Sequence, residues 1–259
     1  MALLADDLRI AFDRVAFARS VGVEPDDWQG ELLRTGFDRI LLNCCRQSGK
    51  STTAALIALH RALYHPGSLV LILAPAERQA KESFGKVAQA YRKPGHLVAP
   101  DSYRKLGIRF ANGSRIEALP GSEKTIRGFS GVDLLVLDEA SRVDAGLYFA
   151  VRPMLAVSGG ALIMLSTPAG RRGVFFEEWT EGARWERYEV PAEECLRISG
   201  AFLEDERRSL PRRVFDQEYR CVFVETEDAV FSFEDVAGAM DPGVTPLFGA
   251  PAEPKGKAG

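Results

Sequence analysis

The sequence predicts an α/β fold in which helices cover both faces of a mostly parallel β-sheet, as a three-layer sandwich. Apolar runs of strand length alternate along the chain with stretches of helical periodicity, an order typical of parallel sheets. The run SLVLILA at 68–74 is apolar at every position after its serine, as expected for a strand covered on both sides. The chain has 259 residues and a hydrophobic content of 46%, which is enough for one large core.

The first segment, residues 1–25, is predicted to form an amphipathic helix. Apolar residues recur at helical spacing over 3–21, with acidic and basic residues between them. We expect this helix to act as a lid or docking element. Residues 25–27 then open a second, short helix that carries Trp28 and Gln29.

The elements that follow alternate between strand and helix. Strands are predicted at 40–42, 68–74, 107–110, 114–119, 133–137 and 161–166, with an edge strand at 185–190. Helices are predicted at about 50–64, 76–91, 144–151, 200–209 and 211–219. The dipeptide Asn112-Gly113 predicts a tight hairpin turn. We therefore expect one domain over 26–226, with a small helical lid from about residue 172, and a linker or tail at 227–259.

Charge and composition narrow the class of protein. Acidic residues exceed basic ones by only 36 to 33, so the net charge of -3 does not indicate a nucleic-acid partner, and any contact with DNA would be local. No apolar run is long enough to span a bilayer, and the acidic start of the chain differs from a signal peptide, so we expect a soluble, intracellular protein. The four cysteines lack metal-ligand spacing, and we expect them to be reduced.

The segment RQSGKST at 46–52 lies between the first predicted strand and the helix after it. Gly49, Lys50 and Ser51 supply what a triphosphate and its magnesium ion need: backbone amides at a helix start, a lysine and a hydroxyl. The full phosphate-binding pattern would place a glycine at position 44, where this chain has Cys44. A chance GKS tripeptide on a surface loop is the alternative. The position between a buried strand and a helix favours the nucleotide site.

Two adjacent carboxylates, Asp138 and Glu139, follow the apolar run LLVL. They fall at the carboxyl end of a predicted strand, where open α/β sheets bind their ligands. We expect Asp138 to hold a magnesium ion, directly or through a water, and Glu139 to polarise the water that attacks the γ-phosphate. Alternatively, the two acids cap the next helix, because acids favour helix N-termini. Their occurrence downstream of the Lys50 loop favours the catalytic assignment.

These segments and several others resemble, in the same order, the motifs of phage terminase large subunits. CRQSGKST at 45–52 resembles the Arg-Gln-x-Gly-Lys-Ser loop of that family, which often lacks the first glycine. The acidic segment 137–140 and Ser166-Thr167-Pro168 are similar to its acidic and coupling motifs. Further similar segments are Trp28-Gln29, for the glutamine motif that contacts adenine, 74–80, for the segment after the second strand, and 217–224, for the end of the ATPase region. Each motif is weak alone, but their order is specific.

The resemblance implies an ASCE-type P-loop NTPase with a RecA-like core that binds ATP and Mg²⁺. The nucleotide contacts that it implies are Gln29, Arg46, Gln47, Ser48, Gly49, Lys50, Ser51 and Thr52. Ser51 and Asp138 would hold the magnesium ion. Glu139 and Lys50 would be the catalytic residues.

Three further residues are assigned from the family. Ser166 and Thr167 end a strand predicted beside the acidic one, and would couple the loss of the γ-phosphate to motion, although Ser-Thr-Pro also simply ends strands. Arg127 lies in a loop before the acidic strand, where an arginine of the resembling terminases reaches the neighbouring subunit's site as a trans arginine finger. Arg127 and Arg46 could each be an ordinary solvated arginine. Which of the two stabilises the transition-state charge stays open.

The implied function is that of an ATPase motor that translocates double-stranded DNA into a procapsid. The resemblance implies a homo-oligomeric ring, a pentamer when assembled on a portal and a monomer in isolation. Arg109 and Arg115, or basic residues within 86–105, would contact DNA phosphates without reading the bases. The small terminase subunit is a further expected partner. We expect action in the cytoplasm of the infected host cell, no membrane contact and no retention in the mature virion.

Two alternatives and one absence complete the expectations. A helicase-like ATPase outside genome packaging would need a second motor lobe, for which 259 residues leave no room. A catalytically weak scaffold or nucleotide-gated DNA-binding module is disfavoured by the intact Lys50, Ser51, Asp138 and Glu139. Resembling terminases continue into a nuclease domain near 242–259, so no DNA cleavage is expected from this polypeptide. Whether that domain was removed or is naturally absent stays open.

Overall fold

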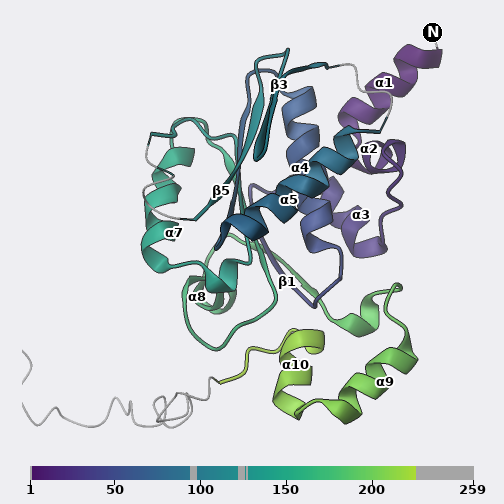
Figure 1. Ribbon diagram of the computed structural model, residues 1–259, viewed down its shortest axis with the longest axis vertical. Coiled ribbons are helices and arrows are strands. Elements are labelled where there is room, and N and C mark those ends of the chain that lie inside the picture. The colour runs from purple at the N-terminus through teal and green to yellow at the C-terminus, as the bar shows by residue number, and fades with distance from the viewer. Residues whose placement is uncertain (1, 94–97, 122–125, 127, 226–259) are drawn as a thin grey trace, which may run out of the picture. The chain divides into compact units, whose positions relative to one another are not determined.

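An eight-stranded β-sheet in the order β3-β4-β5-β2-β6-β7-β1-β8 forms the middle layer of the computed structural model (Figure 1). Its strands are β1 Arg39–Cys44, β2 Leu69–Ala74, β3 Pro100–Arg104, β4 Gly107–Phe110, β5 Arg115–Pro120, β6 Leu134–Asp138, β7 Ala161–Ser166 and β8 Glu186–Val190. From β5 to β8 in this order the strands are parallel, whereas β4 is antiparallel to both β3 and β5. Parallel strands end at the same edge of a sheet, so β1, β7 and β6 bring their carboxyl ends together.

Helices cover both faces of this sheet (Figure 1). One layer consists of α1 Ala2–Phe12, α2 Arg14–Ser20, α3 Asp27–Arg34, α4 Lys50–Tyr64 and α5 Glu77–Tyr91, and the other contains α7 Ala145–Val151 and α8 Val174–Thr180. Two further helices, α9 Gly200–Ser209 and α10 Arg212–Arg220, follow β8. The predicted three-layer α/β sandwich with a mostly parallel sheet is therefore confirmed.

The structure describes residues 2–93, 98–121, 126 and 128–225. Residues 1–224 form one unit, and of the second unit, 225–259, only Glu225 is described. Arg127 and the predicted tail at 227–259 therefore lie outside the described residues. None of the helices in the described part of the chain is long and apolar enough to cross a membrane.

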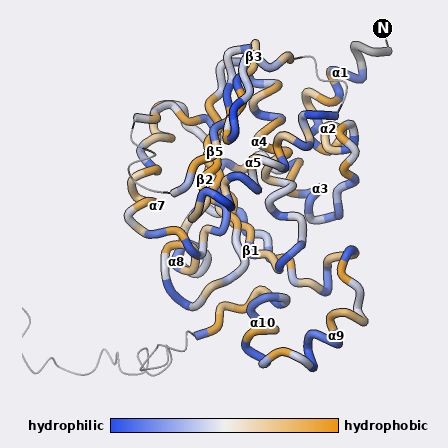
Figure 2. The backbone as a smooth tube through the Cα atoms, viewed as in Figure 1, coloured by the Kyte–Doolittle hydropathy of each residue, from blue (hydrophilic) through white to orange (hydrophobic). Residues whose placement is uncertain are grey.

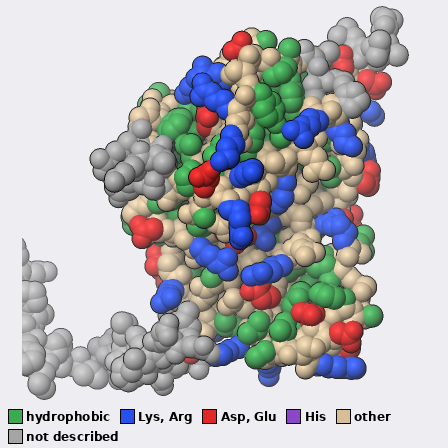
Figure 3. Space-filling model, viewed as in Figure 1, with side chains coloured by type: hydrophobic (Ala, Val, Ile, Leu, Met, Phe, Trp, Pro, Cys, Tyr) green, Lys and Arg blue, Asp and Glu red, His purple; other side chains and the backbone are tan. Residues whose placement is uncertain are grey.

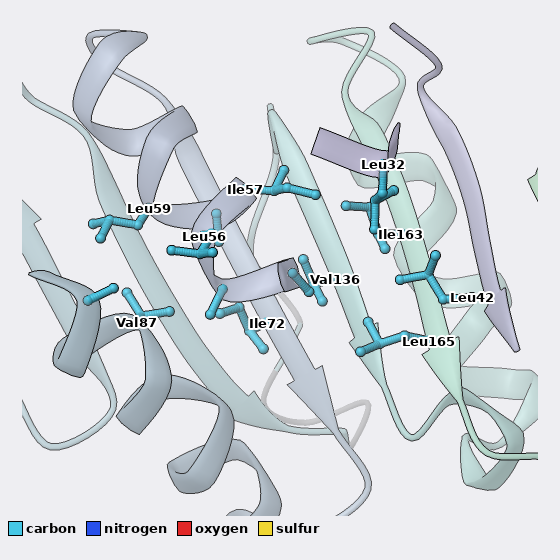
Figure 4. Close-up of a cluster of buried hydrophobic side chains, with 14 of the residues drawn as sticks. Leu32, Leu42, Leu56, Ile57, Leu59, Ile72, Val87, Val136, Ile163 and Leu165 are labelled. Carbon is cyan, nitrogen blue, oxygen red and sulfur yellow. The ribbon is translucent and has the colours of Figure 1, made fainter. Parts of the chain in front are cut away.

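Alternate residues of each strand face the two helical layers. On β1, Leu41 belongs to the core beneath α7, whereas Ile40 and Leu42 belong to the core beneath α4. Figure 4 shows the α4 side, where Leu56 points toward the strand residue Ile72. Hydrophobic residues are concentrated along the central strands (Figure 2). Burying each such side chain stabilises the fold by about 1.5–3 kcal/mol, which fixes the strand ends that carry the polar residues.

The segment predicted as one N-terminal helix forms two helices, so that prediction is wrong. α1 ends at Phe12, and Asp13 has extended backbone angles. The Asp13 carboxylate accepts a hydrogen bond of 2.8 Å from the Val15 amide and so caps α2. A side chain that bonds a nearby amide in this way competes with continuation of a helix. Helical periodicity continues across Asp13, so the apolar pattern does not reveal the break.

The edge of the sheet also carries an element that the sequence does not predict. β3 is an edge strand whose residues are exposed or half-buried. It therefore lacks the apolar alternation by which a strand is recognised. Helix α8, of seven residues, is a further element that the sequence analysis does not predict.

Candidate functional site

The loop between β1 and α4 wraps around the start of a helix. Gly49 precedes α4 with φ of +94°, in the left-handed region that favours glycine. A Cβ atom at this position would lie 2.6 Å from Gln29 Nε2 and 3.0 Å from Arg197 Nη2. The backbone conformation therefore favours glycine, and any larger residue would also displace the ends of the Gln29 and Arg197 side chains. Gln47 also has a positive φ, of 59°, so the loop turns sharply into the helix.

The loop forms one wall of a cavity of about 630 Å³. The predicted nucleotide contacts that line it are Arg46, Gln47, Gly49, Lys50, Ser51 and Thr52. Asp138, Glu139 and Thr167 line the same cavity from the ends of β6 and β7. Figure 3 shows basic side chains, with acidic ones among them, gathered across the middle of one face of the molecule. Cations predominate on the cavity wall, so the site suits a polyanion.

Hydrogen bonds join the loop to the acidic strand. Ser51 Oγ donates to Asp138 Oδ1 at 3.3 Å. Ser83 Oγ of α5 donates to Asp138 Oδ2 at 2.5 Å, and the Glu139 amide donates to Oδ1 at 3.0 Å. Asp138 is only 5% exposed, so the protein determines the direction of its carboxylate. The loop and the acidic pair therefore meet at one place.

The same place can contribute oxygen ligands to a hard cation. The Ser51 hydroxyl and the Asp138 carboxylate are neighbours, and Mg²⁺ prefers oxygen ligands. Among the described residues no group of three or more His, Cys, Asp or Glu side chains could hold a metal ion. The pair formed by Ser51 and Asp138 fits Mg²⁺, which proteins usually hold through one or two carboxylates together with substrate phosphates.

Lys50 reaches across to the end of β7. Its Nζ donates to Thr167 Oγ1 at 3.2 Å and lies 3.5 Å from the Cys45 carbonyl oxygen. Ser166 Oγ is 2.6 Å from Ser141 Oγ, which also donates to the Thr167 carbonyl at 2.9 Å. The end of β7 thus contacts both the loop lysine and the turn that follows β6.

Glu139 occupies a strained backbone position at the mouth of the cavity. Its φ of 55° lies in the left-handed region, which costs a residue with a side chain about 1–2 kcal/mol. Its carboxylate is 3.8 Å from Arg142 Nη1 and its side chain is one-quarter exposed. The short 3-10 turn Ala140–Arg142 follows directly and brings Arg142 beside Glu139.

Three of the predicted site residues that the structure describes do not line the cavity. Gln29 is buried, and its Oε1 accepts a hydrogen bond of 2.9 Å from the Asp26 amide, so it caps α3 behind Gly49. Ser48 is fully buried. Ser166 is also buried and contacts the site through Ser141. Arg46 does line the cavity, but its guanidinium is paired with Glu218 of α10.

Arg197 is a cavity residue that the sequence did not indicate. Its Nη1 donates to Asp26 Oδ1 at 2.9 Å, and its Nη2 donates to the Ser48 carbonyl at 2.5 Å. It therefore connects the segment after β8 with both α3 and the loop. No local pattern could have revealed it, because its partners are more than a hundred residues away in the chain.

The segment after β8 packs closely against the start of the loop. The Arg46 amide donates to the Glu218 carbonyl at 3.2 Å, and Asn43 Nδ2 donates to the Cys221 carbonyl at 2.8 Å.

All four cysteines are buried and free, in agreement with the prediction of reduced thiols. Burial raises the pKa of Cys44 to about 12, so this thiol behaves as a small apolar residue.

Comparison with known proteins shows which family and which relatives the chain is similar to. Residues 41–237 match a family model described as "Terminase large subunit, T4likevirus-type, N-terminal". The terminase large subunits of Thermus phage G20c and Thermus virus P23-45 are each 25% identical to the chain, with 85% of the chain and 53% of the relative covered. The chain spans about half the length of these curated relatives.

Similar folds occur among solved structures. The large terminase ATPase domain of Thermus phage P74-26 superposes with a TM-score of 0.70 at 24% identity, over 80% of this chain and 97% of that one. The large terminase of bacteriophage D6E in complex with ATP-γ-S gives 0.65 at 12% identity, over 77% and 53%. At these identities the likeness shows the fold, which is the RecA-like P-loop fold, with β7 between the loop strand β1 and the acidic strand β6.

Proposed function

The chain belongs to the terminase large subunit family, and from that premise we propose that it is the ATP-hydrolysing motor region of a phage DNA-packaging machine. The observation that carries the proposal is the hydrogen bond between Ser51 and Asp138, which joins the phosphate-binding loop to the acidic strand. A triphosphate and its magnesium ion need both segments at one place. One similar structure is described as a terminase ATPase domain and another as a large terminase in complex with ATP-γ-S, and both support the choice of nucleotide.

The residues of the phosphate end receive distinct roles in this proposal. The backbone of the loop and Lys50 hold the β- and γ-phosphates, and Ser51 and Asp138 hold Mg²⁺, which neutralises phosphate charge when bound. Glu139 accepts the proton of the attacking water, whose oxygen bonds to the γ-phosphorus while the bond from that phosphorus to the bridging oxygen breaks. ADP and inorganic phosphate are the products. The strained, partly exposed position of Glu139 is suited to a water-activating carboxylate.

We assign the coupling role to the end of β7. Thr167 accepts a hydrogen bond from Lys50, and Ser166 contacts Ser141 in the turn after the acidic pair. When the γ-phosphate leaves, Lys50 loses its anionic partner, and the bond to Thr167 transmits this change to β7. The two hydroxyls are thus placed to detect the nucleotide state.

The base end of the site lies on the opposite side of the loop. Gln29, predicted to contact the adenine, is behind Gly49, and Arg197 covers the same region. We place the adenine here, beside α3, with Gln47, Ser48 and Thr52 around the phosphates. Arg46 approaches the phosphates only if its pair with Glu218 opens, so we assign charge stabilisation to Arg127, donated in trans by a neighbouring subunit.

We propose that double-stranded DNA binds near the β4–β5 hairpin. Arg109 and Arg115 are directly opposite each other in the antiparallel register, and Arg109 is exposed. Like charges at opposed positions destabilise a strand pair, and a phosphate backbone would relieve that repulsion. The assembly proposed is a ring, pentameric on a portal, which works with the small terminase subunit in the cytoplasm of the infected host cell. No observation favours the helicase-like alternative.

Hydrolysis measured against protein concentration tests the proposal. The full chain should bind ATP with Mg²⁺ and hydrolyse it, and the rate per molecule should rise with concentration if neighbouring subunits complete the site. Lys50→Ala should remove hydrolysis, because the phosphates lose their main cationic contact. A wild-type chain that binds no nucleotide under any of these conditions would refute the proposal.

A further inference from the structure

One cationic side chain of the cavity has no partner in the described part of the chain. The cations on the cavity wall are Arg46, Lys50, Arg78, Lys86, Arg142 and Arg197. All except Lys86 form an ion pair or a hydrogen bond; the partners, in the same order, are Glu218, Thr167, Glu82, Glu139 and Asp26. Lys86 is half-buried and makes neither kind of contact with another described residue.

The position of Lys86 is fixed by the helix that carries it. Ser83, three residues earlier on α5, donates to Asp138 Oδ2 at 2.5 Å. Residues three apart on a helix share one face, so Lys86 lies on the face of α5 that meets the acidic strand. The charges that act on Lys86 most strongly include those of Asp138, Lys50 and Glu139. These residues all belong to the phosphate end of the site, and none belongs to the base end near Arg197.

A half-buried ammonium group that forms no ion pair is unfavourable in the empty site, and the charges of Asp138, Glu82 and Glu139 offset this only in part. Burial lowers the pKa of Lys86, and the neighbouring Lys50 adds to this effect, while Asp138 opposes it. The cost disappears when an anion occupies the cavity beside it. In the nucleotide-free protein, α5 thus places in the cavity a cation that forms no ion pair with the loop or with the acidic strand.

We propose that Lys86 contacts the terminal phosphate of the bound nucleotide, as a second lysine supplied in cis from α5. The inference rests on the proposed function, because it presumes a nucleotide in this cavity. Lys86 donates a hydrogen bond to a γ-phosphate oxygen and takes no part in proton transfer, which remains with Glu139. Unlike an arginine donated by a neighbouring subunit, this contact is available to a single chain.

The test compares nucleotides with and without a terminal phosphate. In the full chain, Lys86→Met should weaken ATP-γ-S binding about tenfold, as expected for the loss of one charge-assisted hydrogen bond, and change ADP binding by less than about twofold. Lys86→Arg should restore most of the preference for ATP-γ-S. Lys81→Met is the matched control, since Lys81 is exposed on α5 and outside this cavity, and should change neither affinity.

Each outcome separates this assignment from the proposed function. If the wild-type chain binds neither nucleotide, the proposed function fails and Lys86 with it. If the wild type binds ATP-γ-S but Lys86→Met keeps the same ratio of ATP-γ-S to ADP affinity, only the Lys86 assignment is wrong. In that case Lys86 merely balances the charges of Asp138 and Glu139. A melting temperature measured for each variant identifies unfolding, and Lys86→Gln, which also removes the charge, then takes the place of Lys86→Met.

Discussion

The two ends of the cavity are built in different ways. At the phosphate end, Lys50 and Asp138 are 7% and 5% exposed and are held by hydrogen bonds between strand ends and helix starts. At the base end, Arg197 is 46% exposed and reaches Asp26 from a segment far along the chain. The phosphate end is therefore built on the buried strands of the core, whereas the base end is closed by an ion pair at the surface.

This difference indicates that the residues at the two ends of the cavity have different roles. Residues at the phosphate end cannot move unless the strands beneath them move, so they are suited to chemistry that requires fixed positions. An exposed ion pair contributes little free energy and opens readily, so Arg197 is suited to admitting and retaining the nucleotide. We therefore expect substitutions at the phosphate end to change kcat, metal use or the preference for a terminal phosphate, and substitutions at the base end to change mainly the affinity for all nucleotides.

The largest effect is expected from Glu139→Ala, the sharpest test of this division. Loss of the water-activating carboxylate should lower kcat by about 10³-fold, while the affinity for ATP changes by less than about threefold. Single-turnover hydrolysis and equilibrium binding measure the two quantities separately. Glu82→Ala is the matched control, because Glu82 is a carboxylate of the same cavity that pairs with Arg78, and it should leave kcat within about threefold. Hydrolysis by Glu139→Ala at the wild-type rate would disprove its catalytic role.

The phosphate end is also the part that the sequence predicts best. Apolar runs reveal β1, β6 and β7 because strands buried on both faces need continuous hydrophobic residues. Once these strands are parallel neighbours, the polar residues at their ends must meet. The convergence of Ser51 and Asp138 follows from this topology. Local sequence and strand order together therefore suffice for the chemical centre.

The base end and the helix α5 show where sequence reasoning stops. Arg197 lies outside helices and strands, and its contacts depend on how the segment after β8 returns to the loop. For Lys86 the helix was predicted, but periodicity does not tell which side of α5 faces Asp138. The hydrogen-bonding capacity of Asp13 was likewise hidden within an unbroken apolar pattern. Contacts between residues far apart in the sequence, and the rotation of a helix about its axis, depend on the three-dimensional fold and cannot be predicted from local sequence.

A smaller effect, confined to the Mg²⁺ requirement of hydrolysis, is expected from Ser51→Ala. Removing the hydroxyl beside Asp138 should raise the Mg²⁺ concentration needed for half-maximal hydrolysis by about 30-fold, within the range found for lost metal contacts. Ser51→Thr keeps the hydroxyl and should behave as the wild type. A titration of hydrolysis with Mg²⁺ at saturating ATP measures the change. An unchanged Mg²⁺ requirement in Ser51→Ala would show that this hydroxyl does not contact the ion.

The smallest effect is expected from Arg197→Ala, and it decides whether the two ends differ at all. Because the guanidinium is half exposed, its loss should raise the Kd for ATP by only about threefold and leave kcat at saturating ATP unchanged. Arg207→Ala removes a comparable surface pair on α9, away from the cavity, and should change neither quantity. If Arg197→Ala instead lowers kcat as Glu139→Ala does, the base end also fixes the reacting groups. Ser48, whose carbonyl accepts a hydrogen bond from Arg197, would then be the residue through which it acts, because Ser48 precedes Gly49 and Lys50 in the loop.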